Sequence, residues 1–252
     1  MAVTTSGKDK LLKWMRVYIH AYDLSGDTRT FAALSNGYDV ASMLGVNQSV
    51  NWFMASSGRI LGLRGYQALL NDATGGAFTR LKQTAGSPTT TRLSAAFVCG
   101  GEPAVGDPAY VMNSIQIDDR ASFDAAKGIL TADFLVDRAQ YSVSAVNPLG
   151  VVLSEATALS ATTNKSSFDY GASSSNGAHA NIHIISAGGS WVFKVQHSTN
   201  DADWSDLITF VVTGSALNSE TGLATGTINR YVRFQATRTS GTCTPVCFFA
   251  RN

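Results

Sequence analysis

The side chains best suited to metal binding or proton transfer are few in this sequence and far apart. The histidines are His20, His179, His183 and His197. A strand carrying His179 and His183 on one face would separate them by about 13 Å, because each residue advances a strand by about 3.3 Å. One metal ion cannot bridge that distance. His197 falls on the apolar face of its segment and is predicted to be a core residue with its hydrogen bonds satisfied. The sequence therefore predicts no metal site and no cofactor.

The cysteines and the one adjacent acidic pair are also poorly arranged for chemistry. Cys243 and Cys247 have the spacing of half a zinc site, but no second half accompanies them. Pro245 between them predicts an edge or a turn, and we interpret both cysteines as buried thiols. Asp118 and Asp119 would point to opposite faces of a strand, so we interpret them as part of a solvated turn.

No motif of a familiar enzyme class occurs in the chain. P-loop, G-x-S-x-G, H-E-x-x-H and dinucleotide-binding patterns are all missing. A catalytic triad assembled from distant residues would leave no such local motif. The expectation from the sequence is that the protein is not an enzyme.

Three aromatic residues are candidates for stacking against a sugar. Trp191 shares a face with Phe193 and Val195, so we predict that it packs in the core. Tyr231 lies in a predicted strand. Trp204 follows a polar turn and remains the candidate surface contact for a glycan.

The composition restricts the partners of this protein. Charged residues make up 15% of the chain, against about 25% in typical soluble domains, and the net charge is +1. Tight binding to nucleic acid would require a basic excess that is missing. No apolar run is long enough to span a membrane, and the first residues lack the apolar segment of a signal peptide. We expect the chain to fold in a cytoplasm.

Residues 1–150 have the pattern of an all-β assembly domain with one short helix. The predicted strands cover 15–22, 28–34, 60–70, 93–98, 109–117 and 130–136. The helix is predicted within 38–57, where Tyr38, Ala41 and Phe53 suit a helical period and Asn47 could cap the first turn. Residues 71–92 are rich in Gly and Thr and are predicted to form a long loop or arm.

Residues 151–252 are predicted to form a separate β-sandwich, Ig-like or jelly-roll-like, after a composition break around 145–150. Its strands are expected at 151–159, 178–186, 191–198, 207–212, 231–239 and 246–250, separated by glycine-rich turns. The clearest segment is 191–212, where two alternating runs flank the polar turn 199–203. It predicts a β-hairpin.

Several segments resemble the major tail (tail tube) proteins of long-tailed bacteriophages. The segment 17–26 (VYIHAYDLSG) is similar to the start of these proteins, as is the order of the blocks at 38–40 and 62–66 that follow. The segments 178–184, 194–198, 204–207 and 227–233 resemble the accessory sandwich domain of some members. The likeness covers most of the chain, but residues 84–92 and 243–247 match no part of it.

This resemblance implies a tail-tube-like β-barrel or sandwich that forms hexameric rings, which stack into a tube. Inner strands of neighbouring subunits would join into one sheet, so that edge strands need little charge to protect them. DNA would pass through without specific binding, and tail proteins such as the tape measure protein would be partners. The subunit would be assembled in the host cytoplasm and reside in the tail of the virion, with residues 151–252 outside the tube.

Five carboxylates are candidates for a lumen surface that repels phosphates. They are Asp118, Asp119, Asp124, Asp133 and Asp137. The alternative is that they face solvent or pair with Arg120, Lys127 and Arg138. Two other functions remain open: a capsid decoration or spike protein, and a carbohydrate-binding module.

Overall fold

The computed structural model describes residues 15–30, 33–43, 52–73, 76–77, 79, 93–99, 102–124, 129–138, 149–215 and 218–252. Nearly all regular structure in this part is antiparallel strand, which confirms the all-β prediction. The first-half strands are β1 (Met15–Ile19), β2 (Tyr22–Asp23), β3 (Thr28–Thr30), β4 (Ala33–Met43), β5 (Trp52–Leu69), β6 (Leu93–Cys99), β7 (Pro108–Asp124) and β8 (Ile129–Arg138). The others are β9 (Leu149–Ser154), β10 (Thr163–Asn164), β11 (Phe168–Asp169), β12 (Ala178–Ser186), β13 (Ser190–Ser198), β14 (Ser205–Thr213), β15 (Asn218–Ala224), β16 (Tyr231–Ser240) and β17 (Thr244–Arg251).

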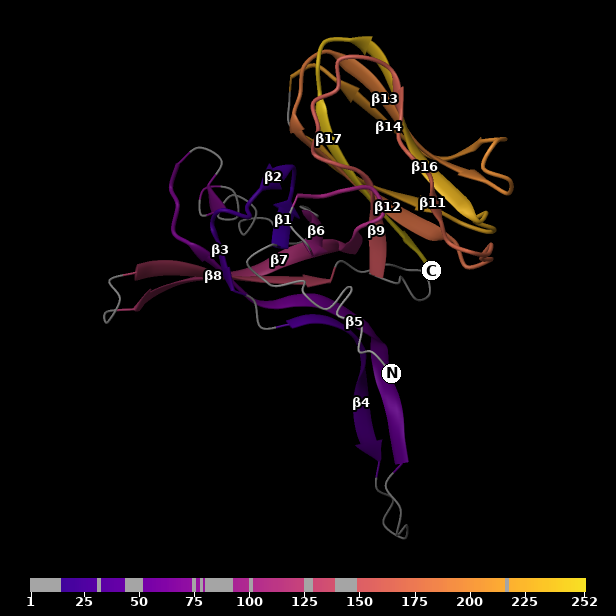
Figure 1. Cartoon of the computed structure of the whole chain (residues 1–252). Coiled ribbons are helices and arrows are strands. Elements are labelled where there is room, and N and C mark those ends of the chain that lie inside the picture. Colours follow the sequence, from indigo (N-terminus) through magenta and orange to yellow (C-terminus); the bar gives the residue numbers. More distant parts are fainter. Residues whose placement is uncertain are drawn as a thin grey trace, which may run out of the picture.

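The second half is a β-sandwich, as predicted (Figure 1). One of its layers has the strand order β15-β12-β17-β9, and the other has β10-β16-β13-β14 with β11 beside β16. Alternate residues of both layers enter one core, in which Trp191, Phe193, Phe234 and Phe249 are completely or almost completely buried. Burying such large apolar surfaces is the main source of stability for a sandwich of this size.

The hairpin predicted at 191–212 is confirmed, with Trp191 opposite Val212. Its turn is closed by Asn200, whose side-chain oxygen accepts hydrogen bonds from the backbone N–H groups of Ala202 and Asp203. Asp201 adopts a φ of 60°, which a turn-forming aspartate tolerates. The strand β15 was not predicted, because its sequence NSETGLA is polar and contains a glycine.

One sheet continues from the sandwich into the first half. The strand β9 pairs with β17 on the sandwich side and with β7 on the other, so Gly150 lies opposite Ala109. A second apolar cluster lies where the two halves meet, and we call this region the seam. In it, Tyr18, Val98 and Val111 from the first half pack with Phe248 and Ala250 from β17. The sequence predicts a domain boundary at residue 150. The sheet nevertheless continues across that position, because β9 pairs with strands of both halves.

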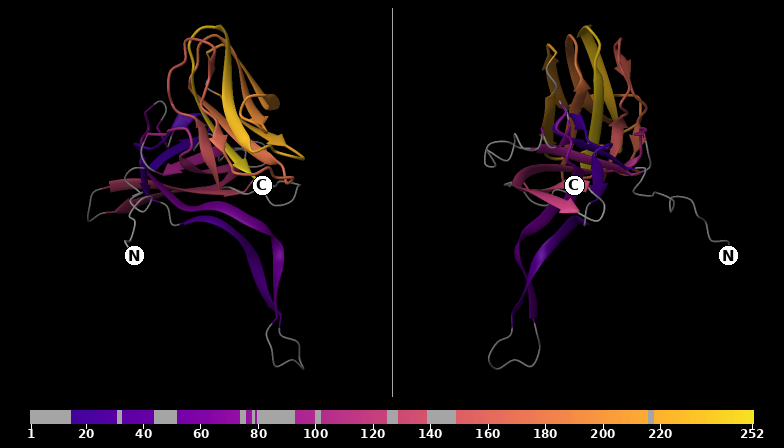
Figure 2. Two further views of the ribbon diagram at one scale, coloured as in Figure 1. Left: turned by 45° about the vertical axis from the view of Figure 1, so that its right-hand side comes forward. Right: turned by 90° about the vertical axis from the view of Figure 1, so that its left-hand side faces the viewer.

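The strands β4 and β5 form a long hairpin that projects away from the rest of the molecule (Figures 1 and 2). The short helix predicted within 38–57 is therefore wrong for its described residues, which pair as strands from Tyr38 opposite Arg59 to Met43 opposite Trp52. Apolar residues in so short a segment fit a helical period and a strand period equally well, and pairing decides between them. Residues 44–51, including Asn47, lie outside the described part.

The segment 118–124 also differs from its prediction. It is no turn but the second half of β7, paired with β8 from Asp118 opposite Leu135 to Asp124 opposite Ile129. The register shifts between Gln116 and Asp118, so the pairing of β7 with β8 carries a bulge or irregularity there. Within the described residues, no helix is long and apolar enough to cross a bilayer.

Candidate functional site

The first candidate surface consists of two sheet edges in the first half that have no partner strand among the described residues. Ser114 pairs with Leu93 of β6 on one side and with Arg138 of β8 on the other, so β6 and β8 lie along opposite edges of β7. Beyond Ser114, no described strand continues along the β6 edge. On β5, Gly62 pairs with Ser35 of β4 on one side and with Asp137 of β8 on the other. The strand order here is thus β7-β8-β5-β4.

Both outer strands of this sheet offer backbone groups to a further strand. Among the described strands, β4 pairs with β5 alone, and residues 115–124 of β7 pair with β8 alone. Residues 52–61 of β5 likewise pair only with β4 in the described part, so the hairpin is a two-stranded ribbon for about 30 Å of its length. An isolated two-stranded ribbon is marginally stable in water. Unpaired edges of this length are templates for another chain.

The five predicted lumen carboxylates lie on the outer strand β7 and on its neighbour β8. Asp118, Asp119 and Asp124 belong to β7, and Asp133 and Asp137 belong to β8. The backbone register places Arg120 opposite Asp133, and the pairing of these side chains also remains a prediction. Lys127 lies outside the described residues, and the lumen role remains a prediction.

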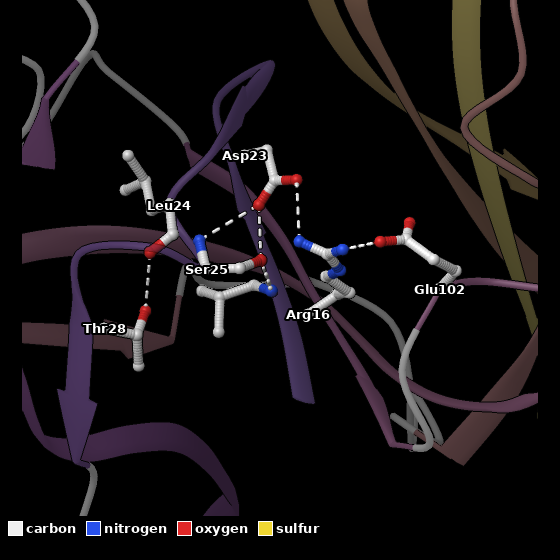
Figure 3. A network of polar contacts seen from close by, with 7 residues as sticks. Arg16, Asp23, Leu24, Ser25, Thr28 and Glu102 are labelled. Carbon is white, nitrogen blue, oxygen red and sulfur yellow. Dashed lines mark hydrogen bonds and ion pairs between the residues drawn. The ribbon is translucent and has the colours of Figure 1, made fainter. Parts of the chain in front are cut away.

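A polar network fixes the turn region next to this sheet (Figure 3). The Arg16 guanidinium pairs with Asp23 at 3.8 Å and also with Glu102. Asp23 accepts a hydrogen bond from the Ser25 backbone N–H at 3.0 Å, and the Thr28 hydroxyl donates to the Leu24 carbonyl at 2.8 Å. The ion pairs are partly exposed and therefore contribute little stability, so we assign the network a structural role.

Asp27 anchors the start of the predicted 71–92 arm. Its carboxylate accepts a hydrogen bond from the Asn71 side-chain amide at 2.9 Å and another from the Ala77 backbone N–H at 2.8 Å. The Leu69 N–H also donates to the Asp27 carbonyl. Most of 71–92 lies outside the described residues, so its role as an arm stays a prediction.

Removing this carboxylate should loosen the arm while leaving the sandwich intact. We expect Asp27→Ala to lower the free energy of unfolding by about 1–2 kcal/mol, because two N–H donors lose a charged acceptor. Hydrogen exchange at residues 69–77 should accelerate, whereas exchange in β13 should be unchanged. Asp27→Asn keeps one acceptor oxygen and should show a smaller effect. Equal exchange rates in all three proteins would contradict the anchoring role.

Two of the four histidines lie fully buried in the seam between the halves. The His183 Nδ1 atom accepts a hydrogen bond from the Ala21 backbone N–H at 3.2 Å, and its ring contacts Tyr18 and Phe248. His179 Nε2 donates to the Val111 carbonyl at 3.2 Å. Burial lowers the pKa of His179 to about 4 and that of His183 to about 3. Both rings are therefore neutral at pH 7 and join the sandwich to the first half.

The turn that His183 holds has an unusual backbone. His20 and Ala21 have φ values of 50° and 69°, the left-handed region that residues with a side chain seldom adopt. The hydrogen bond from Ala21 to His183 helps to offset this strain. The His20 ring contacts the Ser219 hydroxyl at 3.2 Å, which is a second link to the sandwich.

The second candidate surface is a row of polar side chains on the outer face of the sandwich layer β10-β16-β13-β14. The Lys194 ammonium pairs with the Asp206 carboxylate at 2.5 Å, and the Gln196 amide donates to Asp206 at 2.7 Å. These contacts lower the pKa of Asp206, so it remains ionised at neutral pH. At the other end, Gln235 donates to Asn164 at 3.0 Å. We call this set of side chains, together with Trp204 and Arg233, the outer-face network.

Gln196 lies on the same face of β13 as Lys194 and is only 7% exposed. The register between β13 and β14 shifts between Val195 and Gln196, which brings Asp206 opposite Gln196. His197 is half-buried rather than a core residue, so that part of its prediction is wrong. Its hydrogen bond is satisfied as predicted, because Nδ1 accepts from the Asn229 N–H at 3.2 Å.

Trp204 and Arg233 meet at the edge of the network, a contact that sequence patterns did not reveal. The guanidinium carbon of Arg233 lies 4.2 Å from the centre of the half-buried Trp204 ring. Arg233 alternates with the buried Val232 and Phe234, which would have predicted an outward side chain. Its partner directly precedes another strand, β14, so only the fold shows the pair.

The structure confirms the interpretation of both cysteines as buried thiols. Cys243 and Cys247 are buried free thiols, and burial raises the pKa of Cys243 to about 11 and that of Cys247 further. Trp191 is completely buried against Phe193, as predicted. In the described part of the chain, no three His, Cys, Asp or Glu side chains gather as metal ligands would.

Comparison with known proteins gives structural likeness of low similarity. No family model and no curated protein matches this chain. Among solved structures, the chain is similar to the SPP1 Dit (gp 19.1) protein, described as a paradigm of the hub adsorption apparatus in phages that infect Gram-positive hosts. The match covers 93% of this chain and 98% of that one, with 8% identity and a TM-score of 0.34. This similarity is too low to transfer a function.

Proposed function

We propose that this protein is a structural subunit of a bacteriophage tail and that it assembles by strand pairing between copies. The observation that carries the proposal is the sheet β7-β8-β5-β4, whose two outer edges differ and have no partner strand in the described residues. Pairing of two different edges is heterologous, and heterologous contacts generate closed rings when the rotation between copies closes. The resemblance of 17–26 and the following blocks to tail tube proteins supports the phage assignment.

Within the tail, we propose the tube subunit, with hexameric rings that stack. The ribbon formed by β4 and β5 projects far enough to reach a neighbouring copy, and pairing there would satisfy backbone groups that are otherwise exposed (Figure 2). The low share of charged residues suits a surface that is permanently covered by identical subunits. The carboxylates of β7 and β8 would then lie in the joined sheet.

Cysteine cross-linking between singly substituted proteins tests the edge pairing. We expect a mixture of Ser35→Cys and Ser122→Cys proteins to form disulfide-linked dimers under mild oxidation, because β4 of one copy would lie beside β7 of the next. Ser35→Cys alone should cross-link poorly, and this protein is the matched control. Equal cross-linking in both samples would instead indicate a symmetric contact between identical edges.

Electron microscopy of the assembled protein then separates the tube from other roles. Stacked sixfold rings of indefinite length are expected for a tube subunit. Single rings that never stack would place the protein elsewhere in the tail, and trimers would favour a capsid decoration or spike protein. A protein that stays monomeric at all concentrations would overturn the proposal.

A further inference from the structure

Arg233 is held in one position, but its terminal nitrogens have no hydrogen-bond partner among the described residues. Its Nε donates a hydrogen bond to the Gln196 Oε1 atom at 3.0 Å, and its guanidinium stacks on Trp204. No hydrogen bond or ion pair with a described residue engages Nη1 or Nη2. The fold already holds this guanidinium in place. Its planar pair of N–H donors can therefore bind a ligand with little further loss of side-chain entropy.

The surrounding charges leave Arg233 without a bonded counter-ion. The nearest carboxylate of the network, Asp206, is engaged by Lys194 and Gln196. Asp201 acts on Arg233 only at a distance, since the two form no ion pair. Burial lowers the pKa of Arg233, although an arginine remains protonated in proteins. A partly desolvated cation without an ion pair is stabilised by an anionic ligand.

We propose that the outer-face network binds an acidic saccharide, whose carboxylate or phosphate group is held by the Arg233 fork. Beside the arginine, amide side chains of Gln235 and Asn164 continue across β16 and β10. The Asn164 amide nitrogen has no partner among the described residues, so it can donate to a sugar hydroxyl. Amides offer both a donor and an acceptor, which suits neighbouring hydroxyl groups. Trp204 positions the arginine, because Arg233 already covers one face of the indole.

This inference is independent of the assembly proposal, since it concerns the opposite end of the chain. Failure of either one leaves the other standing. The sequence pointed to Trp204 as a direct glycan contact, and the structure moves the main contact to Arg233.

The test is a titration of the full-length protein followed by the indole N–H signal of Trp204 in proton–nitrogen NMR spectra. Trp204→Phe identifies that signal. Sodium glucuronate and glucose differ only in the carboxylate, so they form a matched pair of probes. We expect glucuronate to shift the signal saturably with a dissociation constant of about 1–10 mM, and glucose to bind at least about tenfold more weakly. Glucose 1-phosphate distinguishes a phosphate from a carboxylate preference.

Two arginine variants decide whether the fork is responsible. Arg233→Lys keeps the charge but loses the planar donors, and should weaken glucuronate binding at least about tenfold. Arg238→Lys changes an exposed arginine on the same strand and should bind like the parent. The proposal is overturned if no acidic sugar binds saturably, if glucose binds as well as glucuronate, or if the two variants behave alike. Equal binding of inorganic phosphate alone would overturn the saccharide part.

Discussion

Acidification from about pH 7 to about pH 4.5 is expected to destabilise this protein by several kcal/mol. The cause is the pair of buried histidines in the seam. Burial lowers the pKa of His179 to about 4 and of His183 to about 3, whereas both would titrate near 6.5 in the unfolded chain. For His183, the nearby His20 lowers the pKa further.

The free energy of unfolding changes with pH because the folded and unfolded states bind different numbers of protons. Between about pH 6.5 and pH 4 the unfolded chain takes up protons at both rings and the folded protein does not, so the free energy of unfolding falls as the pH falls. Each unit of difference corresponds to about 1.4 kcal/mol per histidine, which gives a loss on the order of 5 kcal/mol at pH 4.5. Asp169 cannot cause this loss, because its pKa is 3.8 in the unfolded chain and is lowered to about 2 by its hydrogen bonds with Arg230, and both values lie below pH 4.5.

Urea unfolding at several pH values measures the effect, and two substitutions serve as its control. His183→Asn retains an acceptor near Nδ1 for the Ala21 N–H, and His179→Gln retains a donor near Nε2 for the Val111 carbonyl. The double variant should be less stable at neutral pH, since packing is altered, but its stability should change little between about pH 6.5 and 4.5. A parent protein whose stability is constant over this range would contradict the assignment, as would a double variant with the parent's slope.

Replacement of Gly150 by alanine is the second change expected to have a large effect. An added Cβ would overlap the Phe249 carbonyl oxygen and lie 2.9 Å from the Ala250 Cβ. Both neighbours belong to β17, whose residues fill the core clusters on each side of the sheet. The clash can be relieved only by separating β9 from β17, so we expect a loss of about 3 kcal/mol.

Gly26→Ala is the matched control for this substitution. An added Cβ at Gly26 would have no atom within 4 Å, so the same chemical change should alter the free energy of unfolding by less than about 1 kcal/mol. Hydrogen exchange should show faster exchange in β9, β17 and residues 108–110 of β7 for Gly150→Ala alone. Unchanged exchange at the seam would show that the strands adjust without separating.

The sandwich could be predicted from sequence because its turns carry clear local signals. Gly177, Gly189 and Gly241 all have positive φ values; the first two directly precede β12 and β13, and the third directly follows β16, as expected of glycine-rich turns between strands. The alternation of Trp191, Phe193 and Val195 gave the buried face of β13 directly. Local residue types determine these features, so no knowledge of distant contacts was needed.

The features that the sequence did not predict depend on contacts between distant segments. The described residues of 38–57 form strands because β4 pairs with β5, although their apolar residues also fit a helical period. The position of Asp206 opposite Gln196 follows from a bulge that only the pairing of β13 with β14 defines. The contact of Arg233 with Trp204 joins β16 to the residue that precedes β14, and the seam joins His183 to a turn 162 residues away. The spacing of apolar residues along one segment does not show which distant segment it will contact.

The position of β9 between β7 and β17 also sets the order in which the chain can fold. Hairpins such as β4–β5, β7–β8 and β13–β14 join neighbouring segments and close short loops, so we expect them to form first. The pairing of β17 with β9 and β12 must wait for segments that are distant in the chain, and loop closure makes it slow. The edges of β4 and β7 are therefore available to other copies before the seam is complete. A slow last step gives partly folded chains time to pair incorrectly, so concentrated refolding should produce aggregates and dilute refolding should not.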